Sequence, residues 1–305
     1  MYDVIIIGAG PAGLTAAIYT ARAKLKTLII EKMIPGGQVT TTHLVENYPG
    51  FTEPVNGFVL MNNFQKQAQN FGAEILTSKE VVSIQKIGNL FKIKTIDKEF
   101  ESKSILIATG AKFKSLGIPG EEKFKGRGVS YCATCDGAFF KDREVAVIGG
   151  GNSALEEALF LTKFVKKVYL IHRRNQFRAD KIFQERVKEN EKIETILNYI
   201  PLEIKGDNEV KSIVIQDVES GKKEELKVDG VFLFIGLSPN SEFLNNFVET
   251  DENGYILVNE NFETNIKGCF AAGDVIKKKV RQIATAVGDG AAAGVNIKDY
   301  IEGNL

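Results

Sequence analysis

The sequence contains few of the residues that cross-link a chain through disulfides or metals, with three cysteines and two histidines among 305 residues. Three cysteines cannot form a disulfide framework, so we expect the chain in a reducing compartment, the cytoplasm. A structural zinc needs about four ligands at characteristic spacing. Besides the close pair Cys132 and Cys135, the candidate ligands are Cys269, His43 and His172, which stand far apart. This scarcity disfavours a metal site.

The sequence also lacks an excess of charge of either sign and lacks any long apolar run. Its 39 basic and 39 acidic residues cancel, and no run of lysine or arginine is long enough to predict a patch for nucleic acid or membrane. The first apolar run, 4–7, has no basic leader and is broken by Gly8, Gly10 and Pro11, unlike a signal peptide or a membrane helix. We therefore expect neither a nucleic-acid partner nor a membrane association.

The length is sufficient for two domains, and the first begins with a nucleotide-binding pattern. The β-branched run 2–7 predicts a buried parallel strand that leads directly into the turn Gly8–Gly13 and an alanine-rich helix at 14–23. These glycines allow close approach of a pyrophosphate to the positive end of the helix. A second strand, 27–30, ends at Glu31, where a carboxylate can bind ribose hydroxyls. The pattern predicts a dinucleotide site; the alternative is an ordinary glycine turn.

The residues that follow alternate between loop and short strand patterns. The stretch 35–51 is polar and rich in glycine and proline, which predicts a long loop, and 58–71 has helical apolar spacing. Short apolar runs then predict the strands of a meander, at 75–76, 81–84, 91–95 and 100. A buried strand at 104–108 ends at Thr109 and Gly110, where the backbone can again approach a ligand closely.

The strand, glycine turn and helix then occur a second time, at 144–148, 149–154 and 155–164. The next strand, 167–171, is followed by a basic run, and its three arginines, Arg173, Arg174 and Arg178, take the place of the carboxylate. Guanidiniums at this position would bind a 2′-phosphate, which favours NADPH over NADH. The alternative is an exposed basic start of a helix. His172 either contacts that phosphate or is a surface residue.

The rest of the second unit repeats the plan of the first, which indicates a duplication. A second meander, at 200–204, 210–217 and 225–227, precedes a buried strand that ends at Ile235 and Gly236. Linker patterns occur at 112–120 and 238–241. After the second linker, a short strand at 268–273 is followed directly by Asp274, and a helix of small residues is expected at 284–297. Cys269, within that strand, is expected to be a buried core residue and not a reactive thiol.

These patterns predict an α/β fold of two Rossmann-like dinucleotide-binding domains, the second inserted in the first. The expected boundaries give a discontinuous outer domain, 1–115 with 244–305, and an inner domain, 116–243. The inner domain contains Cys132 and Cys135, two thiols that can close a small disulfide, and Asp136, which could protonate a departing thiolate. Dithiol redox chemistry is predicted; half of a zinc site is the alternative.

Several strings resemble the bacterial-type, low-molecular-weight thioredoxin reductases, in the order of that family and over nearly the whole length. The strings are Gly36-Gly37-Gln38, Glu46–Gly50, the redox segment Gly128–Gly137, His172–Ala179, Ala271–Asp274 and Arg281-Gln282. The resemblance implies a flavoprotein of two dinucleotide-binding domains, with FAD in the outer domain and NADPH in the inner one. It also implies a homodimer whose partner is thioredoxin.

The resemblance further implies a site residue by residue. For FAD the implied residues are Gly8, Gly10, Pro11, Ala12, Gly13, Glu31, Gly36, Gly37, Gln38, Asn47, Thr109, Gly110, Asp274, Arg281, Gln282 and Ile283. For NADPH they are Gly151, Asn152, Ser153, His172, Arg173, Arg174, Arg178, Ile235 and Gly236.

The catalytic residues implied by the resemblance are Cys135, facing the flavin, Cys132, attacking the disulfide of thioredoxin, and Asp136, the acid. Nicotinamide and disulfide would then compete for one flavin, so the inner domain is expected to swing about linkers at 116–120 and 238–243. Two alternatives stay open. One is a flavin oxidoreductase of the same fold that is fed by ferredoxin or uses oxygen, and the other is a dinucleotide sensor or zinc-stabilised binding module.

Overall fold

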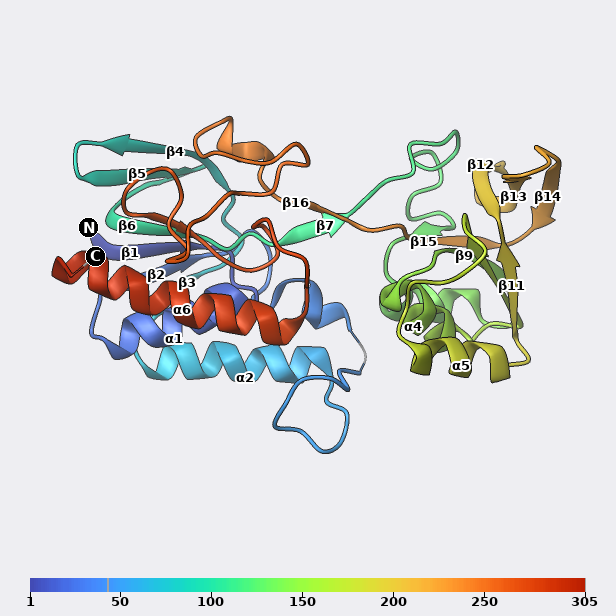
Figure 1. Cartoon of the computed structure of the whole chain (residues 1–305), viewed down its shortest axis with the longest axis horizontal. Helices are drawn as coiled ribbons and strands as arrows, with labels where there is room; N and C mark the ends of the chain where they lie inside the picture. Colours follow the sequence, from blue (N-terminus) through green and yellow to red (C-terminus); the bar gives the residue numbers. More distant parts are fainter. Residues whose placement is uncertain (43, 305) are drawn as a thin grey trace. The chain divides into compact units, whose positions relative to one another are not determined.

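The computed structural model describes every residue except 43 and 305 and divides into two compact units (Figure 1). Unit 1 is Met1–Lys112 with Ser238–Leu305, and unit 2 is Phe113–Leu237, so the second unit is inserted in the first. The divisions fall a few residues before the expected boundaries at 115/116 and 243/244. The two crossing segments pair with each other there, as the short strands β7 (Ala111–Phe113) and β16 (Leu237–Pro239).

Unit 1 is built on a seven-stranded sheet of order β3-β2-β1-β6-β5-β4, with β17 also paired to β6. Its strands are β1 (Tyr2–Ile7), β2 (Thr27–Ile30), β3 (Glu74–Leu76), β4 (Val81–Ile87), β5 (Leu90–Thr95), β6 (Glu99–Ile107) and β17 (Cys269–Ala271). β1 pairs in parallel with β2 and β6, β17 pairs in parallel with β6, and β4 and β5 are antiparallel. The strand after the second linker therefore returns to the first sheet.

The separate strands predicted at 100 and at 104–108 are wrong, because β6 is one continuous strand of nine residues. Polar residues suggested a break, but two of them are buried in the sheet with bonded hydroxyls. The hydroxyl of Ser102 donates to the carbonyl of Ser104, and that of Ser104 donates to the carbonyl of Gly268. Satisfied hydroxyls allow serine to continue a buried strand.

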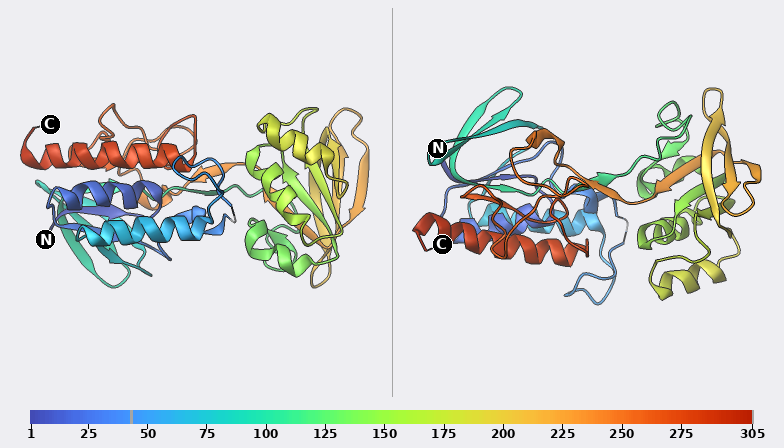
Figure 2. Two further views of the ribbon diagram at one scale, coloured as in Figure 1. Left: turned by 90° about the horizontal axis from the view of Figure 1, so that it is seen from below. Right: turned by 45° about the horizontal axis from the view of Figure 1, so that its top comes forward.

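Three helices of unit 1 lie side by side against this sheet (Figure 2). They are α1 (Pro11–Arg22), α2 (Gly57–Asn70) and α6 (Ile283–Glu302). α1 and α6 approach closely because a Cβ on Gly290 would overlap the carbonyl oxygen of Ala12, and one on Gly294 would meet Ala16. The stretch 35–51 is not all loop, since it contains the 3-10 helix η1 (Gly37–Thr41). A second short helix, η3 (Glu242–Leu244), follows β16.

Unit 2 combines a five-stranded parallel sheet, of order β11-β10-β9-β15-β8, with a three-stranded antiparallel sheet, β12-β13-β14. The strands are β8 (Val129–Ser130), β9 (Glu144–Gly149), β10 (Lys167–His172), β11 (Ile193–Leu197), β12 (Tyr199–Gly206), β13 (Val210–Asp217), β14 (Lys223–Lys227) and β15 (Gly230–Phe234). The helices are α3 (Ala133–Asp136), η2 (Gly137–Phe140), α4 (Asn152–Leu161) and α5 (Lys181–Glu189). No element was predicted at α5 or β11.

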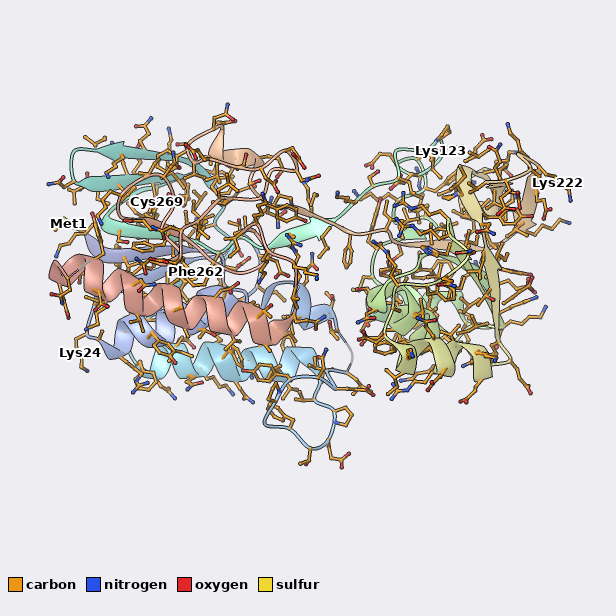
Figure 3. The ribbon with its side chains drawn as sticks, viewed as in Figure 1. Met1, Lys24, Lys123, Lys222, Phe262 and Cys269 are labelled. Carbon is orange, nitrogen blue, oxygen red and sulfur yellow. A yellow bond between two sulfur atoms is a disulfide. The ribbon has the colours of Figure 1, made fainter. Side chains whose placement is uncertain are left out.

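Both faces of the seven-stranded sheet are covered, as expected for parallel strands. Along β1, Val4 and Ile6 join one buried cluster while Ile5 and Ile7 join another. Cys269 is fully buried, as predicted, and Figure 3 labels it within unit 1. Burial raises the pKa of its thiol to about 12, so it is not a reactive thiol. Among all residues except 43 and 305, no helix is both long enough and apolar enough to cross a bilayer.

Candidate active site

The first glycine turn joins β1 to α1 and leaves the start of the helix open. A Cβ on Gly8 would overlap the carbonyl oxygen of Ala108, and a Cβ on Gly13 would overlap that of Gly8. Gly10 is the N-cap of α1, makes no side-chain cap, and has no atom within 4 Å of the position its Cβ would take. Free N–H groups at an uncapped helix start, facing open space, fit a phosphate.

Glu31 and the loop 36–38 are hydrogen-bonded to this glycine turn. The Glu31 carboxylate accepts hydrogen bonds from the backbone N–H of Ala9, at 2.8 Å, and of Met33, at 2.9 Å. The N–H of Gly36 donates to the carbonyl of Ala9 at 2.7 Å, and the side-chain amide of Gln38 donates to the carbonyl of Ala111. The glycine turn 8–13, Glu31 and the loop 36–38, which were predicted separately, are therefore adjacent.

The start of α6 brings a further pair together. The side-chain amide of Asn47 donates to Oε1 of Gln282 at 3.0 Å, although 235 residues separate them. Gln282 is the N-cap of α6, and Ile283, its first residue, packs on a small apolar cluster. The guanidinium of Arg281 lies 4.0 Å from the ring centroid of Tyr255. This contact with Tyr255 could not be predicted from the sequence, because it depends on tertiary packing.

Asp274 follows β17 and lies beside the start of α1. Its atom Oδ1 is buried and accepts no well-aligned hydrogen bond, although the ammonium of Lys278 is 3.2 Å away. Burial raises the pKa of Asp274, and the charge of Lys278 opposes that rise. The preceding Gly273 faces Ala12, since a Cβ there would meet the Ala12 side chain. A buried carboxylate oxygen whose neighbouring ammonium is poorly aligned can accept a hydrogen bond from a ligand hydroxyl.

Thr109 and Gly110, at the end of the first unit's buried strand, have different surroundings. The Thr109 hydroxyl donates to the carbonyl of Asn240 at 2.7 Å, and the Asn240 amide donates back to the carbonyl of Thr109 at 2.9 Å. Gly110 has a φ of +66° and no atom near the position of a Cβ. Thr109 thus ties the chain to the second crossing segment, while Gly110 leaves open space.

The second glycine turn, in unit 2, has the same uncapped helix start. Gly151 is the N-cap of α4, makes no side-chain cap, and has no atom within 4 Å of a Cβ position. In the first turn of α4, Asn152 is held by Asp180 through reciprocal hydrogen bonds of 2.8 and 2.7 Å. The N–H of Arg178 donates to the carbonyl of Gly150 at 2.7 Å, which fastens the basic run to the turn. Ser153 is exposed on the same turn.

The basic run presents its three arginines to solvent. Arg173, Arg174 and Arg178 are exposed, and within the described part of the chain they make no ion pair. His172 is not a surface residue, because it is only 5% exposed and its ring packs on Phe177 at 5.6 Å. Burial and then the nearby arginines lower its pKa. Ile235 and Gly236 follow β15, and the φ of Gly236 is +124°.

The thiol pair is a disulfide, Cys132–Cys135, with its two Cα atoms 5.4 Å apart. Cys132 is the N-cap of α3, and its Sγ accepts the backbone N–H of Cys135 at 3.1 Å. Such a hydrogen bond stabilises a thiolate more than a thiol. Cys132 is half-buried and Cys135 is exposed. The hydrogen bond therefore favours Cys132 as the thiolate, whereas exposure favours Cys135.

Asp136 has a partner that the sequence did not suggest. Oδ2 of Asp136 accepts the hydroxyl of Ser130 at 2.6 Å, and the same hydroxyl oxygen accepts the N–H of Cys132 at 3.1 Å. Ser130 thus joins the carboxylate to the backbone of the first cysteine. It was part of the family-like string, but no residue spacing indicated its role.

A second carboxyl group lies beneath the disulfide helix. Glu157, on α4, lies near the backbone N–H groups of Ala133 and Thr134, and its Oε2 atom is buried without a hydrogen-bond partner. Burial raises its pKa to about 7, and the charge of Glu156 adds to the rise. This residue was missed, because a glutamate within a helical pattern is usually exposed.

Residues 1–42 and 44–304 contain no group of three or more histidine, cysteine or acidic side chains that could together hold a metal ion. His43, a candidate in the zinc alternative, lies outside the described residues.

Comparison with known proteins places these features in a known group. A model of the pyridine nucleotide-disulphide oxidoreductase family matches residues 2–290. A thioredoxin reductase of Bacillus subtilis strain 168 is 48% identical over 99% of this chain and 95% of its own length. A crystal structure of Lactococcus lactis thioredoxin reductase matches with a TM-score of 0.97 and 47% identity, over 99% of this chain and 100% of that one. The thioredoxin reductase of T. acidophilum matches with a TM-score of 0.94 and 38% identity, over 98% of both chains.

Proposed function

The chain belongs to the pyridine nucleotide-disulphide oxidoreductase family and, within it, to the thioredoxin reductases, and on that premise we propose that it reduces thioredoxin with electrons from NADPH. In the whole reaction NADPH and one proton are consumed, and the thioredoxin disulfide becomes a dithiol. The observation that carries the proposal is the Cys132–Cys135 disulfide beside the hydrogen-bonded carboxylate of Asp136. Both lie in the unit whose glycine turn is flanked by three arginines.

We propose that unit 1 holds FAD. The support is the uncapped start of α1 at Gly10, the carboxylate of Glu31 beside it, and the buried oxygen of Asp274. Asn47 and Gln282 would lie toward the flavin, since they join the loop to the start of α6. Flavin, when bound, supplies a two-electron relay between a nicotinamide and a disulfide.

We propose that unit 2 holds NADPH rather than NADH. The diphosphate would bind at the uncapped start of α4, at Gly151, and the 2′-phosphate would bind the exposed guanidiniums of Arg173, Arg174 and Arg178. Buried His172 would pack against the glycine turn, because a Cβ on Gly150 would overlap the imidazole ring. A reductase fed by ferredoxin would have no use for such a cluster of arginines.

The dithiol would reduce thioredoxin by two exchanges. The Cys132 thiolate, stabilised by the N–H of Cys135, attacks one sulfur of the thioredoxin disulfide and forms a mixed disulfide. The Cys135 thiolate then attacks the sulfur of Cys132, which releases thioredoxin as a dithiol and closes the intramolecular disulfide. Asp136 donates a proton to a departing thiolate, and Ser130 holds its carboxylate in place.

Three finer features belong to this proposal. We propose a homodimer and a cytoplasmic location, the first from the family and the second from the use of a reactive dithiol with one buried free cysteine. We also propose that turnover requires unit 2 to swing about the crossings near 112/113 and 237/238, where two paired segments connect the units. Cross-linking the units should leave one half-reaction intact and abolish steady turnover; unchanged turnover would reject the swing.

The direct test is NADPH oxidation that depends on added oxidised thioredoxin. The wild-type chain loaded with FAD should oxidise NADPH only when thioredoxin is present, and much faster than NADH. The Cys132→Ser variant should bind FAD normally and be inactive. Oxidation at the same rate without thioredoxin would point instead to an oxidase.

A further inference from the structure

Three consecutive lysines, Lys277, Lys278 and Lys279, precede the start of α6, and their surroundings differ. The side chain of Lys278 is 13% exposed, and its ammonium lies 2.7 Å from Oδ2 of Asp289 and 3.2 Å from Oδ1 of Asp274. Lys277 and Lys279 are exposed, and across residues 1–42 and 44–304 they show no ion pair. The middle lysine alone of the three is therefore held between two carboxylates.

This cluster lies beside the helix start at which unit 1 is proposed to hold the diphosphate of FAD. Asp289 accepts the N–H of Gly273 at 3.2 Å, so the aspartate of α6 is linked to the end of β17. Gly273 in turn faces the side chain of Ala12 in the first turn of α1. A Cβ on Gly290, next to Asp289, would overlap the carbonyl oxygen of Ala12. Lys278 and its two partners are thus adjacent to α1 through glycines that permit close packing.

Lys278 reduces the net charge of the cluster from two negative charges to one. Asp274 and Asp289 contribute two negative charges, and Lys278 contributes one positive charge. The diphosphate of a dinucleotide adds further negative charge next to this pair. Electrostatic repulsion is stronger where water is partly excluded; Oδ1 of Asp274 is buried, although the side chain as a whole is 30% exposed. Burial raises the pKa of Asp274; Lys278 opposes that rise most strongly and Arg281 also opposes it, in agreement with a compensating role for the lysine that contacts the carboxylate.

We propose that Lys278 is a cofactor-positioning residue, whose ammonium compensates Asp274 and Asp289 so that the diphosphate of FAD can bind beside them. This inference rests on the proposed function, specifically on FAD binding to unit 1. Lys278 acts by compensating the charge of the two aspartates and makes no direct bond to the cofactor. The role belongs to one lysine of the three.

The test uses substitutions of equal size at neighbouring positions. Lys278→Met should weaken binding of FAD to the full-length apoprotein by about tenfold or more, because a partly buried carboxylate pair is left uncompensated. Lys277→Met and Lys279→Met remove one positive charge each from the same loop, but the side chains they replace are exposed to solvent. These two variants should change the FAD dissociation constant by less than about twofold.

A second substitution separates charge compensation from a purely structural role. In the Lys278→Met background, Asp289→Asn returns the cluster to one negative charge and keeps an amide oxygen that can accept the N–H of Gly273. FAD affinity should recover most of the loss. If Lys278→Met does not fold, Lys278→Gln takes its place and should weaken FAD binding to the same extent, whereas Lys278→Arg should bind as the wild type does.

The readouts are the FAD dissociation constant, from quenching of flavin fluorescence, and the melting temperature of each apoprotein. Equal affinity in Lys278→Met and Lys277→Met would overturn the inference. So would a double variant that regains the wild-type melting temperature without regaining FAD affinity. A wild-type apoprotein that binds no FAD would reject the proposed function itself, which is a separate outcome.

Discussion

The hydroxyl oxygen of Ser130 lies 2.6 Å from Oδ2 of Asp136, across the junction between β8 and the disulfide helix α3. A hydroxyl donor this close to a carboxylate fixes the orientation of the carboxylate. The Ser130 oxygen also accepts the N–H of Cys132, so the carboxylate and the first cysteine share one anchor. The proposed acid is thus positioned by a residue that precedes the redox motif.

Ser130→Ala should lower kcat for thioredoxin reduction by about 3- to 10-fold, because Asp136 loses the donor that orients it. Asp136→Asn, which removes the acid itself, should lower kcat by about 100-fold. Steady-state kinetics with thioredoxin measure both effects. Reduction of the enzyme by NADPH in a single turnover serves as the control and should change little. A kcat for Ser130→Ala equal to that of the wild type contradicts the positioning role.

The two cysteines can be assigned by trapping. Cys135→Ser leaves Cys132 free to attack and removes the thiol that resolves the mixed disulfide, so a covalent complex with thioredoxin should accumulate. Cys132→Ser should give little of this complex, and both variants should lose steady turnover. Non-reducing electrophoresis with mass spectrometry detects the adduct. Because Cys135 is the more exposed sulfur, the reverse pattern is the specific result that would exchange the two roles.

The arginine cluster should determine the choice of nicotinamide cofactor. The double variant Arg173→Ala, Arg174→Ala should raise the KM for NADPH by about 10- to 100-fold, because it loses charge-assisted hydrogen bonds to the 2′-phosphate. The KM for NADH, which lacks that phosphate, should change little. Lys188→Ala, an exposed cation on α5, is the matched control. Equal effects on both cofactors would indicate a general effect on folding or binding instead.

Glu157 should make the stability of the chain depend on pH. Its pKa is raised from 4.5 to about 7 in the folded chain, so the folded chain binds this proton more tightly than the unfolded chain does. The resulting stabilisation is complete below the ordinary pKa and is lost as the pH rises through about 7. Its size is at most about 3 kcal/mol.

Glu157→Gln keeps an oxygen near the N–H groups of Ala133 and Thr134 and removes the titration. Relative to this variant, the free energy of unfolding of the wild type should therefore fall between about pH 4.5 and pH 7. Urea titrations at several pH values measure the difference. Glu185→Gln, at an exposed position of α5, should follow the wild type. Parallel curves for the wild type and Glu157→Gln would mean that Glu157 titrates normally.

Much of the fold could be predicted from the sequence because its strongest signals are local. The run from β1 into Gly8 and the run from β9 into Gly149 each contain the strand, turn and helix start within a few residues. α5 was missed because its apolar stripe is short: Val187 is buried, Phe183 one turn earlier is partly buried, and the rest of the nine residues are mostly charged or polar. β6 was divided because buried serines resemble a loop when their partners are unknown.

The candidate site was predictable to the extent that its residues lie in motifs. The resemblance named Asn47 and Gln282 separately, and the structure joins them by a hydrogen bond. Ser130, Glu157 and Lys278 were not found, because their roles depend on which side chains approach them after folding. Lys278 illustrates this limit, since the sequence offers no means of telling it from Lys277 and Lys279.

In the proposed reaction, electrons enter from a nicotinamide cofactor and leave through the Cys132–Cys135 disulfide. The most direct measurement is alkylation of the FAD-loaded wild-type chain under excess NADPH, without oxygen or thioredoxin, followed by peptide mass spectrometry. Both Cys132 and Cys135 should be alkylated after NADPH, and neither should be alkylated before it. A disulfide that stays closed under these conditions would rule out this electron route.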